Sequence, residues 1–202
     1  MADRMAQCGR SAAFRRNDQL EACDLMQSLK LTAVAAFVVL AAGAPAAIAD
    51  DMTHEHATAQ EAVAKVRAAV ALLEKKGEAG LKEFHGTSPF VWKDSYVFVS
   101  NCDTGIIMAN PLQPDRQGKP IADGPTYGGV TAAQRAEEQC ATARKPGGGW
   151  WAYTFAHPGT SKPTRKVSYM TMVPGHPWLV GAGVYDDTTP LEKFEAVSRA
   201  TH

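Results

Sequence analysis

The amino-acid sequence predicts an α+β domain with an antiparallel sheet of about five strands, a long N-terminal helix and a short C-terminal helix. All of the helices are expected to lie on one side of the sheet. Two capping boxes, at residues 58–61 and 131–134, indicate helix starts. Runs rich in β-branched and aromatic residues fill much of the remaining chain. The last three runs are separated by Pro-Gly pairs at 158–159 and 174–175, which are strong turn signals. Strands that follow one another across short turns pair as antiparallel hairpins.

The composition is that of a globular protein. Of the 202 residues, 45% are hydrophobic and 21% are charged, and 21 Lys and Arg balance 21 Asp and Glu. A nucleic-acid-binding protein needs a surplus of basic residues to displace counterions from phosphates, so the balanced charge argues against that class. The length fits one domain, or at most two.

The long helix is expected to begin at the first capping box and to end at Gly77. Apolar residues from Val63 to Leu73 recur at helical spacing, which predicts one buried face. Residues 77–85 are expected to continue as a short second helix and a loop.

The next elements are a hairpin and a long loop. The runs 96–100 and 105–109 are rich in β-forming residues and are separated by four residues, which is typical of a hairpin. The stretch from Pro111 to Gly129 contains many Gly and Pro residues and predicts an irregular loop. Loops of this length inside a compact domain are usually functional or disordered, and we expect this one to cover a binding site.

The C-terminal half alternates helix and sheet again. The second capping box predicts a helix to about Arg144, which the glycines at 147–149 end. Three strands should then follow, at residues 150–156, 165–173 and 178–185. Thr189 and Pro190 give the start signal of a terminal helix, which we assign to residues 188–202.

The N-terminus has the pattern of an export signal. Residues 31–42 carry no charge, and small residues on either side of Ile48 form a cleavage pattern, so residues 26–49 are predicted to be a signal peptide cleaved after Ala49. The alternative is an uncleaved membrane anchor. Residues 1–25 are polar and form either an extended N-region or a mis-assigned start, and residues 50–60 are expected to be a flexible mature N-terminus.

Cysteine usage agrees with export. Cys8 and Cys23 precede the predicted cleavage point, which leaves Cys102 and Cys140 as an even pair in an oxidising compartment. We predict a disulfide between them, and the alternative is two separate buried thiols.

Seven fragments of the chain, in one order and with ordinary gaps, resemble the single Cache domain family. The most specific fragment is the run Gly-Ala-Gly-Val-Tyr-Asp-Asp at residues 181–187, after a strand that begins with Trp178. Others include Tyr-Val-Phe-Val at 96–99, Met-Ala-Asn-Pro at 108–111 and Lys-Val-Ser-Tyr at 166–169. The resemblance covers residues 61–187.

The resemblance implies an extracytoplasmic sensor with a PAS-like sheet and a small-molecule pocket between sheet and loops. Because no signalling segment follows residue 187 in this sequence, we expect a freestanding exported form that is periplasmic or secreted. Any signal would then pass to a separate partner, such as a membrane-bound sensor kinase or chemoreceptor.

Aromatic residues and one lysine on the predicted strands are the candidate ligand-binding residues. Tyr and Trp combine apolar walls with a polar group, and a lysine in an uncharged pocket is a natural counter-ion for a carboxylate. Alternation along a strand places Lys166 and Ser168 on one face and Tyr169 on the other, whereas Tyr96 and Phe98 share a face. The full candidate set is Trp92, Tyr96, Phe98, Asn110, Tyr153, Lys166, Tyr169 and Tyr185.

The sequence therefore favours an exported sensor of a small organic acid, with no cofactor and no enzymatic activity, since it contains no recognisable catalytic motif. The alternative is a structural or protein-interaction module of the cell envelope, whose pocket is filled by its own aromatic residues. His54 and His56 could bind a metal, but the sequence offers no third ligand near them, so we predict no metal site there. His157 is expected to be a turn residue.

Overall fold

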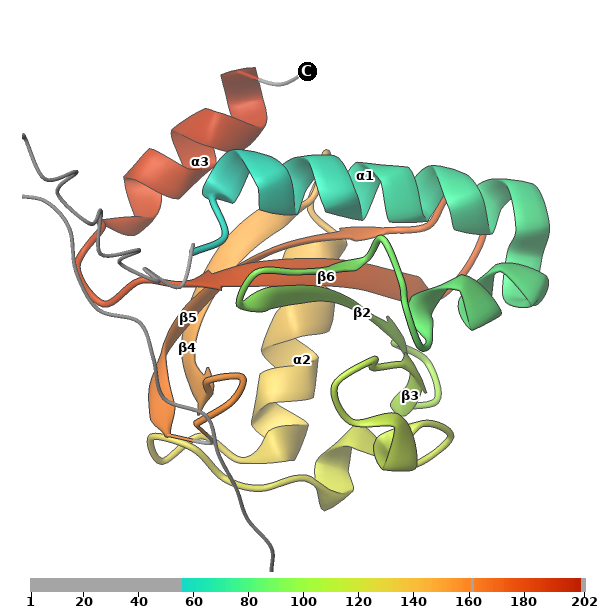
Figure 1. Ribbon diagram of the computed structural model, residues 1–202, viewed down its shortest axis with the longest axis horizontal. Helices are drawn as coiled ribbons and strands as arrows, with labels where there is room; N and C mark the ends of the chain where they lie inside the picture. Colours follow the sequence, from blue (N-terminus) through green and yellow to red (C-terminus); the bar gives the residue numbers. More distant parts are fainter. Residues whose placement is uncertain (1–55, 161, 201–202) are drawn as a thin grey trace, which may run out of the picture. The chain divides into compact units, whose positions relative to one another are not determined.

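The computed structural model describes residues 56–160 and 162–200 and confirms the α+β prediction (Figure 1). The sheet has six strands instead of about five, because Val91 and Trp92 form a two-residue strand beside Tyr96 and Ser95. The helices are α1 (Ala59–Lys76), α2 (Ala132–Ala143) and α3 (Leu191–Ala200), with short 3-10 helices η1 (Gly77–Phe84), η2 (Pro114–Arg116) and η3 (Ile121–Asp123). The strands are β1 (Val91–Trp92), β2 (Ser95–Asn101), β3 (Ile106–Ala109), β4 (Gly149–Ala156), β5 (Pro163–Met172) and β6 (Trp178–Tyr185).

Every strand pairing in the sheet is antiparallel. The order is β1, β2, β6, β5, β4, and β3 pairs with the far end of β2, which confirms the predicted hairpin of β2 and β3. The C-terminal strand β6 therefore lies at the centre, between β2 and β5. Its side chains are buried from Trp178 to Val184, as expected for a strand that is covered on both faces.

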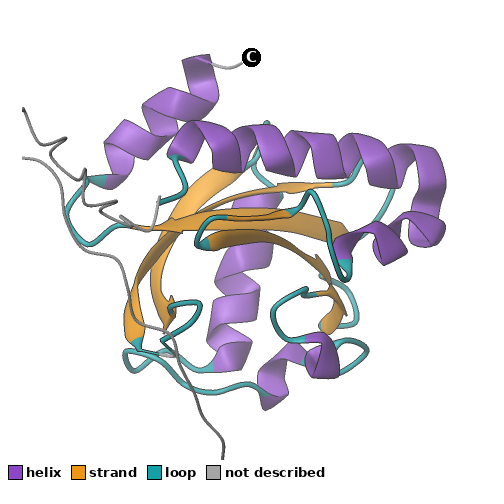
Figure 2. Ribbon diagram, in the orientation of Figure 1, coloured by secondary structure: helices purple, strands orange, loops and turns teal. Residues whose placement is uncertain are grey.

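Helix α1 covers one face of the sheet. The predicted capping box is present, since the Thr58 hydroxyl accepts a hydrogen bond from the Glu61 amide and the Glu61 carboxylate accepts one from the Thr58 amide. The apolar stripe of α1 packs on β2, β5 and β6, and α3 adds Phe194 against Trp150, with ring centroids 5.1 Å apart. Figure 2 shows both helices on the same side of the strands.

Helix α2 covers the opposite face, so the prediction that all helices lie on one side is wrong. The reason lies in the strands, whose apolar and aromatic residues occupy both faces and therefore require two covers. On β2, for example, Val97 and Val99 face α1, whereas Tyr96 and Phe98 face α2.

The predicted disulfide joins Cys102 to Cys140, with their Cα atoms 5.8 Å apart. It links the turn after β2 to α2 and closes a loop with a sequence separation of 38 residues. A cross-link of this span removes chain entropy from the unfolded state and contributes up to about 4 kcal/mol of stability. The disulfide thus fixes α2 against the sheet at one end.

The predicted signal peptide, its cleavage point after Ala49, Cys8, Cys23 and His54 lie outside the described residues. Residues 56–60 belong to the segment that we predicted to be flexible, yet α1 already begins at Ala59 and Ala57 is buried. The Ala57 amide donates to Asp94 Oδ1 over 2.8 Å, which attaches the start of α1 to the sheet. Among the helices that the structure describes, none has the length and apolarity to cross a membrane.

Candidate ligand-binding pocket

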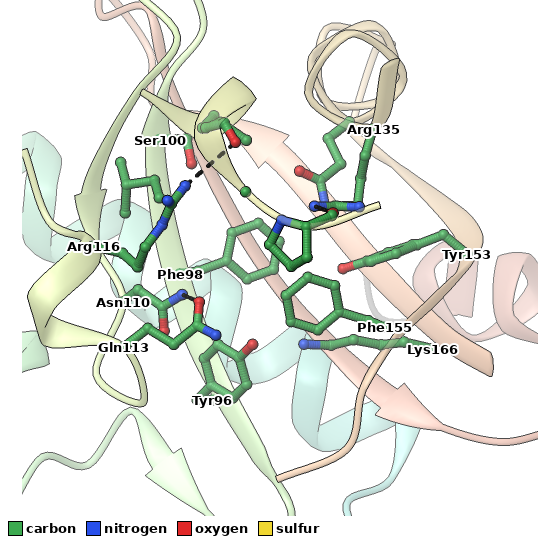
Figure 3. Close-up of a pocket in the computed structure, with 15 residues that line it drawn as sticks. Tyr96, Phe98, Ser100, Asn110, Gln113, Arg116, Arg135, Tyr153, Phe155 and Lys166 are labelled. Carbon is green, nitrogen blue, oxygen red and sulfur yellow. Dashed lines mark hydrogen bonds between the residues drawn. The ribbon is translucent and has the colours of Figure 1, made fainter. Parts of the chain in front are cut away.

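A cavity of about 70 Å³ lies on the α2 face of the sheet (Figure 3). Its walls come from β2, β4 and β5, from Asn110 directly after β3, from α2, and from the predicted covering loop, including Gln113 and Pro125. Residues far apart in the sequence therefore meet at one place because alternate side chains of three strands point the same way.

Four aromatic side chains form the apolar wall of the pocket. Tyr96 and Phe98 come from β2, with ring centroids 6.4 Å apart, and Tyr153 and Phe155 come from β4, with centroids 6.0 Å apart. The Tyr153 hydroxyl lies 3.0 Å from the Ser168 hydroxyl on the neighbouring strand. The hydroxyls of Tyr96 and Tyr153 point toward the same space in Figure 3, so the wall combines apolar rings with two polar groups.

Lys166 is the buried cation of the pocket. Only 1% of the residue is exposed, and its Nζ lies 4.1 Å from the centroid of the Tyr96 ring. The rings of Phe98, Phe155 and Tyr185 lie within 5.3–5.6 Å of the same atom. No hydrogen bond or ion pair joins this ammonium to any residue that the structure describes. Burial lowers the pKa of Lys166 to about 7, although the Asp94 carboxylate partly opposes the shift.

Two glycines of β6 make room for the pocket side chains. Gly183 lies opposite Ser168 in the sheet, and a Cβ atom there would stand 2.7 Å from Lys166 Cε. Gly181 lies opposite Phe98, and a Cβ atom there would stand 2.5 Å from that ring. Larger residues at either position would displace the lysine or the ring. The run Gly-Ala-Gly thus places small residues on the pocket face and Ala182 on the α1 face.

Arg135 on α2 is a second buried cation that the sequence analysis missed. It is 5% exposed, and its guanidinium carbon lies 5.2 Å from the centroid of the Phe155 ring. Its Nη2 donates to the Pro125 carbonyl over 3.3 Å, whereas its buried Nη1 has no hydrogen-bond partner within the described part of the chain. Burial also lowers the pKa of this guanidinium. The helical spacing of Arg135 and Gln139, on the face next to Cys140, is the signal that could have identified it.

The covering segment is held by its own hydrogen bonds. Arg116 donates to the carbonyls of Pro120 and Asp123, over 2.9 and 3.1 Å, and so ties η2 to η3. The Asn110 side-chain amide donates a hydrogen bond to Gln113 Oε1 over 3.4 Å, and both side chains line the pocket. The segment is therefore an ordered wall in this structure.

The structure brings together five of the eight predicted ligand-binding residues, namely Tyr96, Phe98, Asn110, Tyr153 and Lys166. The other three lie elsewhere. Tyr169 lies on the α1 face, as the alternation predicts, with its hydroxyl donating to the Gly147 carbonyl over 2.7 Å. Trp92 packs against the hydrophobic core under α1, with the Lys65 ammonium over its ring. Tyr185 lies beside Lys166, and its hydroxyl donates to the Ala156 carbonyl over 2.8 Å.

The charge of the pocket is unbalanced. Lys166, Arg135 and Arg116 line it, and no Asp or Glu is among its described lining residues. Arg116 uses its donors on backbone carbonyls. Within residues 56–160 and 162–200, neither the Lys166 ammonium nor Arg135 Nη1 has a hydrogen-bond partner. Buried charges are normally paired, so this arrangement is suited to an anion.

The chain is similar to proteins of bacterial chemotaxis. A family model described as the Cache domain matches residues 43–190. Over 101 residues the chain is 30% identical to the methyl-accepting chemotaxis protein McpP of Pseudomonas putida, a stretch that covers 49% of this chain and 18% of McpP. The chain thus spans less than a fifth of the length of that relative.

Two solved structures share the fold. One is a methyl-accepting chemotaxis protein from Vibrio parahaemolyticus, with 18% identity and a TM-score of 0.51, covering 62% of this chain and 86% of that one. The other is described as the periplasmic sensor domain of a chemotaxis protein, with 25% identity and a TM-score of 0.50, covering 61% of this chain and 92% of that one.

Proposed function

Because the chain belongs to the Cache domain family and is similar to the periplasmic sensor domain of a chemotaxis protein, we propose that its pocket binds a small organic carboxylate. The observation that carries the proposal is the pair of buried cations. Lys166 and Arg135 Nη1 offer donors to the cavity, and no carboxylate among the described lining residues neutralises them. A bound carboxylate would supply the missing negative charge and accept charge-assisted hydrogen bonds.

The size of the cavity limits the ligand. A volume of about 70 Å³ is well below the roughly 300–1,000 Å³ of pockets that enclose drug-sized ligands. We therefore place the ligand among small organic acids, with its carboxylate toward the cations and its carbon chain against Phe98 and Phe155.

Ligand binding acts on a protein partner by changing the populations of two conformations. A ligand can shift such an equilibrium only if it binds one state more tightly. The carboxylate favours the state in which α2 and the loop after β3 stay close to Lys166, because only that state neutralises both cations. A membrane-bound chemoreceptor or sensor kinase would read this shift.

The alternative of a structural module requires a pocket filled by its own aromatic rings. The cavity beside Tyr96 and Lys166 supports the ligand-binding proposal instead. No observation on the described residues favours an enzymatic function.

Isothermal titration calorimetry with acetate and propionate tests the proposal. The amides acetamide and propionamide have nearly the same shape but no charge, so they should not bind. Lys166→Met should weaken carboxylate binding by about 10- to 100-fold, because a hydrogen bond to a charged group contributes about 1.5–3 kcal/mol. The same variant should fold at least as stably as the parent without ligand, since it removes a buried unpaired charge.

Lys75→Met is the matched control, because Lys75 is an exposed lysine on α1. It should leave carboxylate affinity unchanged. Equal affinity for the acids and their amides, or full binding by a folded Lys166→Met variant, would contradict the proposal.

A further inference from the structure

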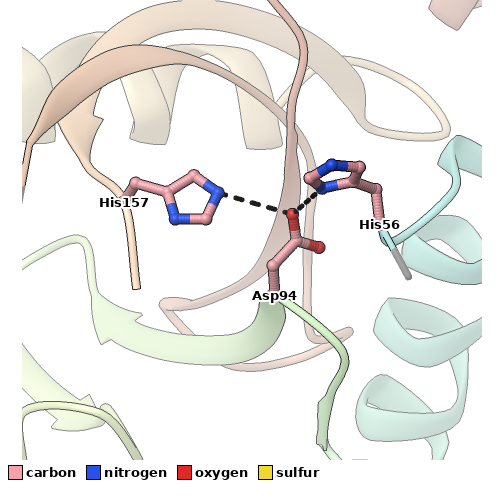
Figure 4. Close-up of side chains that lie close together, drawn as sticks. All are labelled: His56, Asp94 and His157. Carbon is pink, nitrogen blue, oxygen red and sulfur yellow. Dashed lines mark hydrogen bonds and ion pairs between the residues drawn. The ribbon is translucent and has the colours of Figure 1, made fainter. Parts of the chain in front are cut away.

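Two histidines and one aspartate from distant parts of the chain meet outside the pocket (Figure 4). His56 precedes α1, Asp94 lies in the turn between β1 and β2, and His157 follows β4. Asp94 Oδ2 lies 2.7 Å from His56 Nδ1 and 3.5 Å from His157 Nε2. One ligand atom from each residue lies within 4.8 Å of the other two, so a single ion could contact all three.

The hydrogen bonds fix the tautomer of His157. Its Nδ1 lies 2.8 Å from the Pro158 carbonyl, and because a carbonyl oxygen only accepts hydrogen bonds, Nδ1 must carry the proton. In the neutral ring, Nε2 then presents a lone pair. That lone pair faces Asp94 Oδ2, which is also an acceptor. With this tautomer two acceptors face each other, and the contact is favourable only if a cation, either a metal ion or a second proton on His157, lies between them.

We propose that His56, Asp94 and His157 bind a divalent transition-metal ion of the zinc type. Two imidazole nitrogens and one carboxylate oxygen are a ligand set that zinc accepts, with a fourth position left for water. Magnesium and calcium prefer sites made of oxygen ligands, so the two histidines disfavour them. This inference does not depend on the proposed function, because none of the three residues lines the pocket.

The surroundings of the three residues support a metal site. Metal-binding histidines usually donate their other ring N–H to a carbonyl or carboxylate, as His157 does to Pro158. The carboxylate is oriented too, because Asp94 Oδ1 accepts from the Ala57 amide and leaves Oδ2 toward the histidines. Lys93, which precedes Asp94 in the turn, has a φ of 48°, a conformation that costs about 1–3 kcal/mol outside glycine. The turn keeps this strained conformation at the residue before the carboxylate.

The metal site would connect the start of α1 to the sheet at a point next to the pocket. The His157 ring lies 4.3 Å from the Tyr185 ring, centroid to centroid, and the Tyr185 ring lies 5.3 Å from Lys166 Nζ. An ion at this site would hold His56, two residues before the N-cap of α1, in a fixed position against β4 and the turn after β1. Zinc would thus stabilise the attachment of α1 that the Ala57 hydrogen bond begins.

Zinc titration by calorimetry tests the site. All proteins compared should carry Cys8→Ser and Cys23→Ser and no histidine tag, because free thiols and tags also bind zinc. The parent should bind one Zn²⁺ per chain and gain thermal stability as zinc is added, since a ligand of the folded state stabilises it. Magnesium at the same concentration should do neither.

Asp94→Asn and His157→Ala should each weaken zinc binding by at least about tenfold, because loss even of the partner that orients a metal ligand has this effect. His85→Ala removes a histidine outside the cluster and should bind zinc like the parent. Lys166→Met, which alters only the pocket, should also keep the zinc affinity. Circular dichroism should establish that each variant is folded.

Cobalt provides a second measurement on the same proteins. Co²⁺ bound by two histidines and a carboxylate should give visible d–d absorption in the parent and in His85→Ala, and this absorption should be absent from His157→Ala. The inference is overturned if Asp94→Asn and His157→Ala bind zinc as tightly as His85→Ala. It is equally overturned if the parent binds no zinc, in which case a proton on His157 bridges the two acceptors.

Discussion

The two faces of the central sheet are built from alternate residues of the same strands, yet they differ in what they enclose. The face toward α1 is densely packed with aliphatic side chains and rings such as Trp150, and its residues Val97, Val99, Val180 and Ala182 are fully buried. The face toward α2 carries Tyr96, Phe98 and the buried Lys166 around a cavity. The α1 face therefore stabilises the domain, whereas the α2 face keeps polar groups and space for a ligand.

This difference teaches that stability and binding can be separated in one sheet. Each strand contributes to both faces, because successive side chains point to opposite sides of the sheet. Neighbouring residues on a strand therefore lie one in the core and one at the pocket. Val167 and Lys166 illustrate the point, since both are buried neighbours on β5 but only the lysine reaches the cavity. Substitutions on the two faces should then affect different measurements.

Leu73→Ala should have the largest effect on stability. Leu73 is fully buried between α1 and the sheet, and truncation of a buried leucine typically costs about 2–5 kcal/mol, because apolar contacts are lost and a cavity forms. Chemical denaturation followed by circular dichroism should measure the loss. The affinity for propionate should stay the same in the folded variant, and a parallel loss of affinity would show that the two faces are coupled.

Gly183→Ala should have a smaller effect on stability and a clear effect on binding. The new methyl group would collide with Ser168 and with Lys166 Cε, and such overpacking costs about 1–3 kcal/mol. Because the lysine must move, carboxylate affinity should fall. Ala182→Gly is the control on the α1 face at the adjacent residue, and it should leave the affinity unchanged. If both variants bound alike, Gly183 would have no role in positioning the lysine.

Between pH 7 and 9 we expect a gradual rise in the stability of the ligand-free protein. The pKa of Lys166 is about 7 in the folded state and near 10.5 when unfolded, so the unfolded chain binds more protons in this range. Stability must then increase with pH, by at most about 1.4 kcal/mol per pH unit for one group.

Carboxylate affinity should fall over the same pH range, because the neutral amine no longer attracts the anion. Denaturation and calorimetry at several pH values should follow the two trends. Lys166→Met provides the baseline for other titrating groups, and it should lack both trends. Parallel pH profiles for the parent and Lys166→Met would mean that the lysine is not responsible.

Much of the fold could be predicted because its signals are local. The capping boxes at residues 58–61 and 131–134 mark the starts of α1 and α2, and both are present in the structure. The hairpin of β2 and β3 and the three C-terminal strands also follow from local turns and β-forming residues. Which side of the sheet each helix covers depends on packing between distant segments, and this prediction was wrong for α2.

The site could be predicted only in part, for the same reason. Alternation correctly grouped Tyr96 with Phe98 and separated Lys166 from Tyr169. Arg135 was missed because its burial depends on α2 lying across the pocket face. Its helical spacing to Gln139 indicates that the two residues share a helix face, but not what that face covers. The three residues proposed to bind a metal ion were not grouped either, since His56, Asp94 and His157 meet only after three separate segments are packed together.

The most direct test of the central claim is a crystal structure of the protein soaked with propionate. The account predicts that the carboxylate lies within hydrogen-bond distance of both Lys166 Nζ and the Arg135 guanidinium, with its carbon chain against Phe98 and Phe155. A pocket that holds only water at saturating propionate, or a carboxylate bound away from both cations, would contradict it.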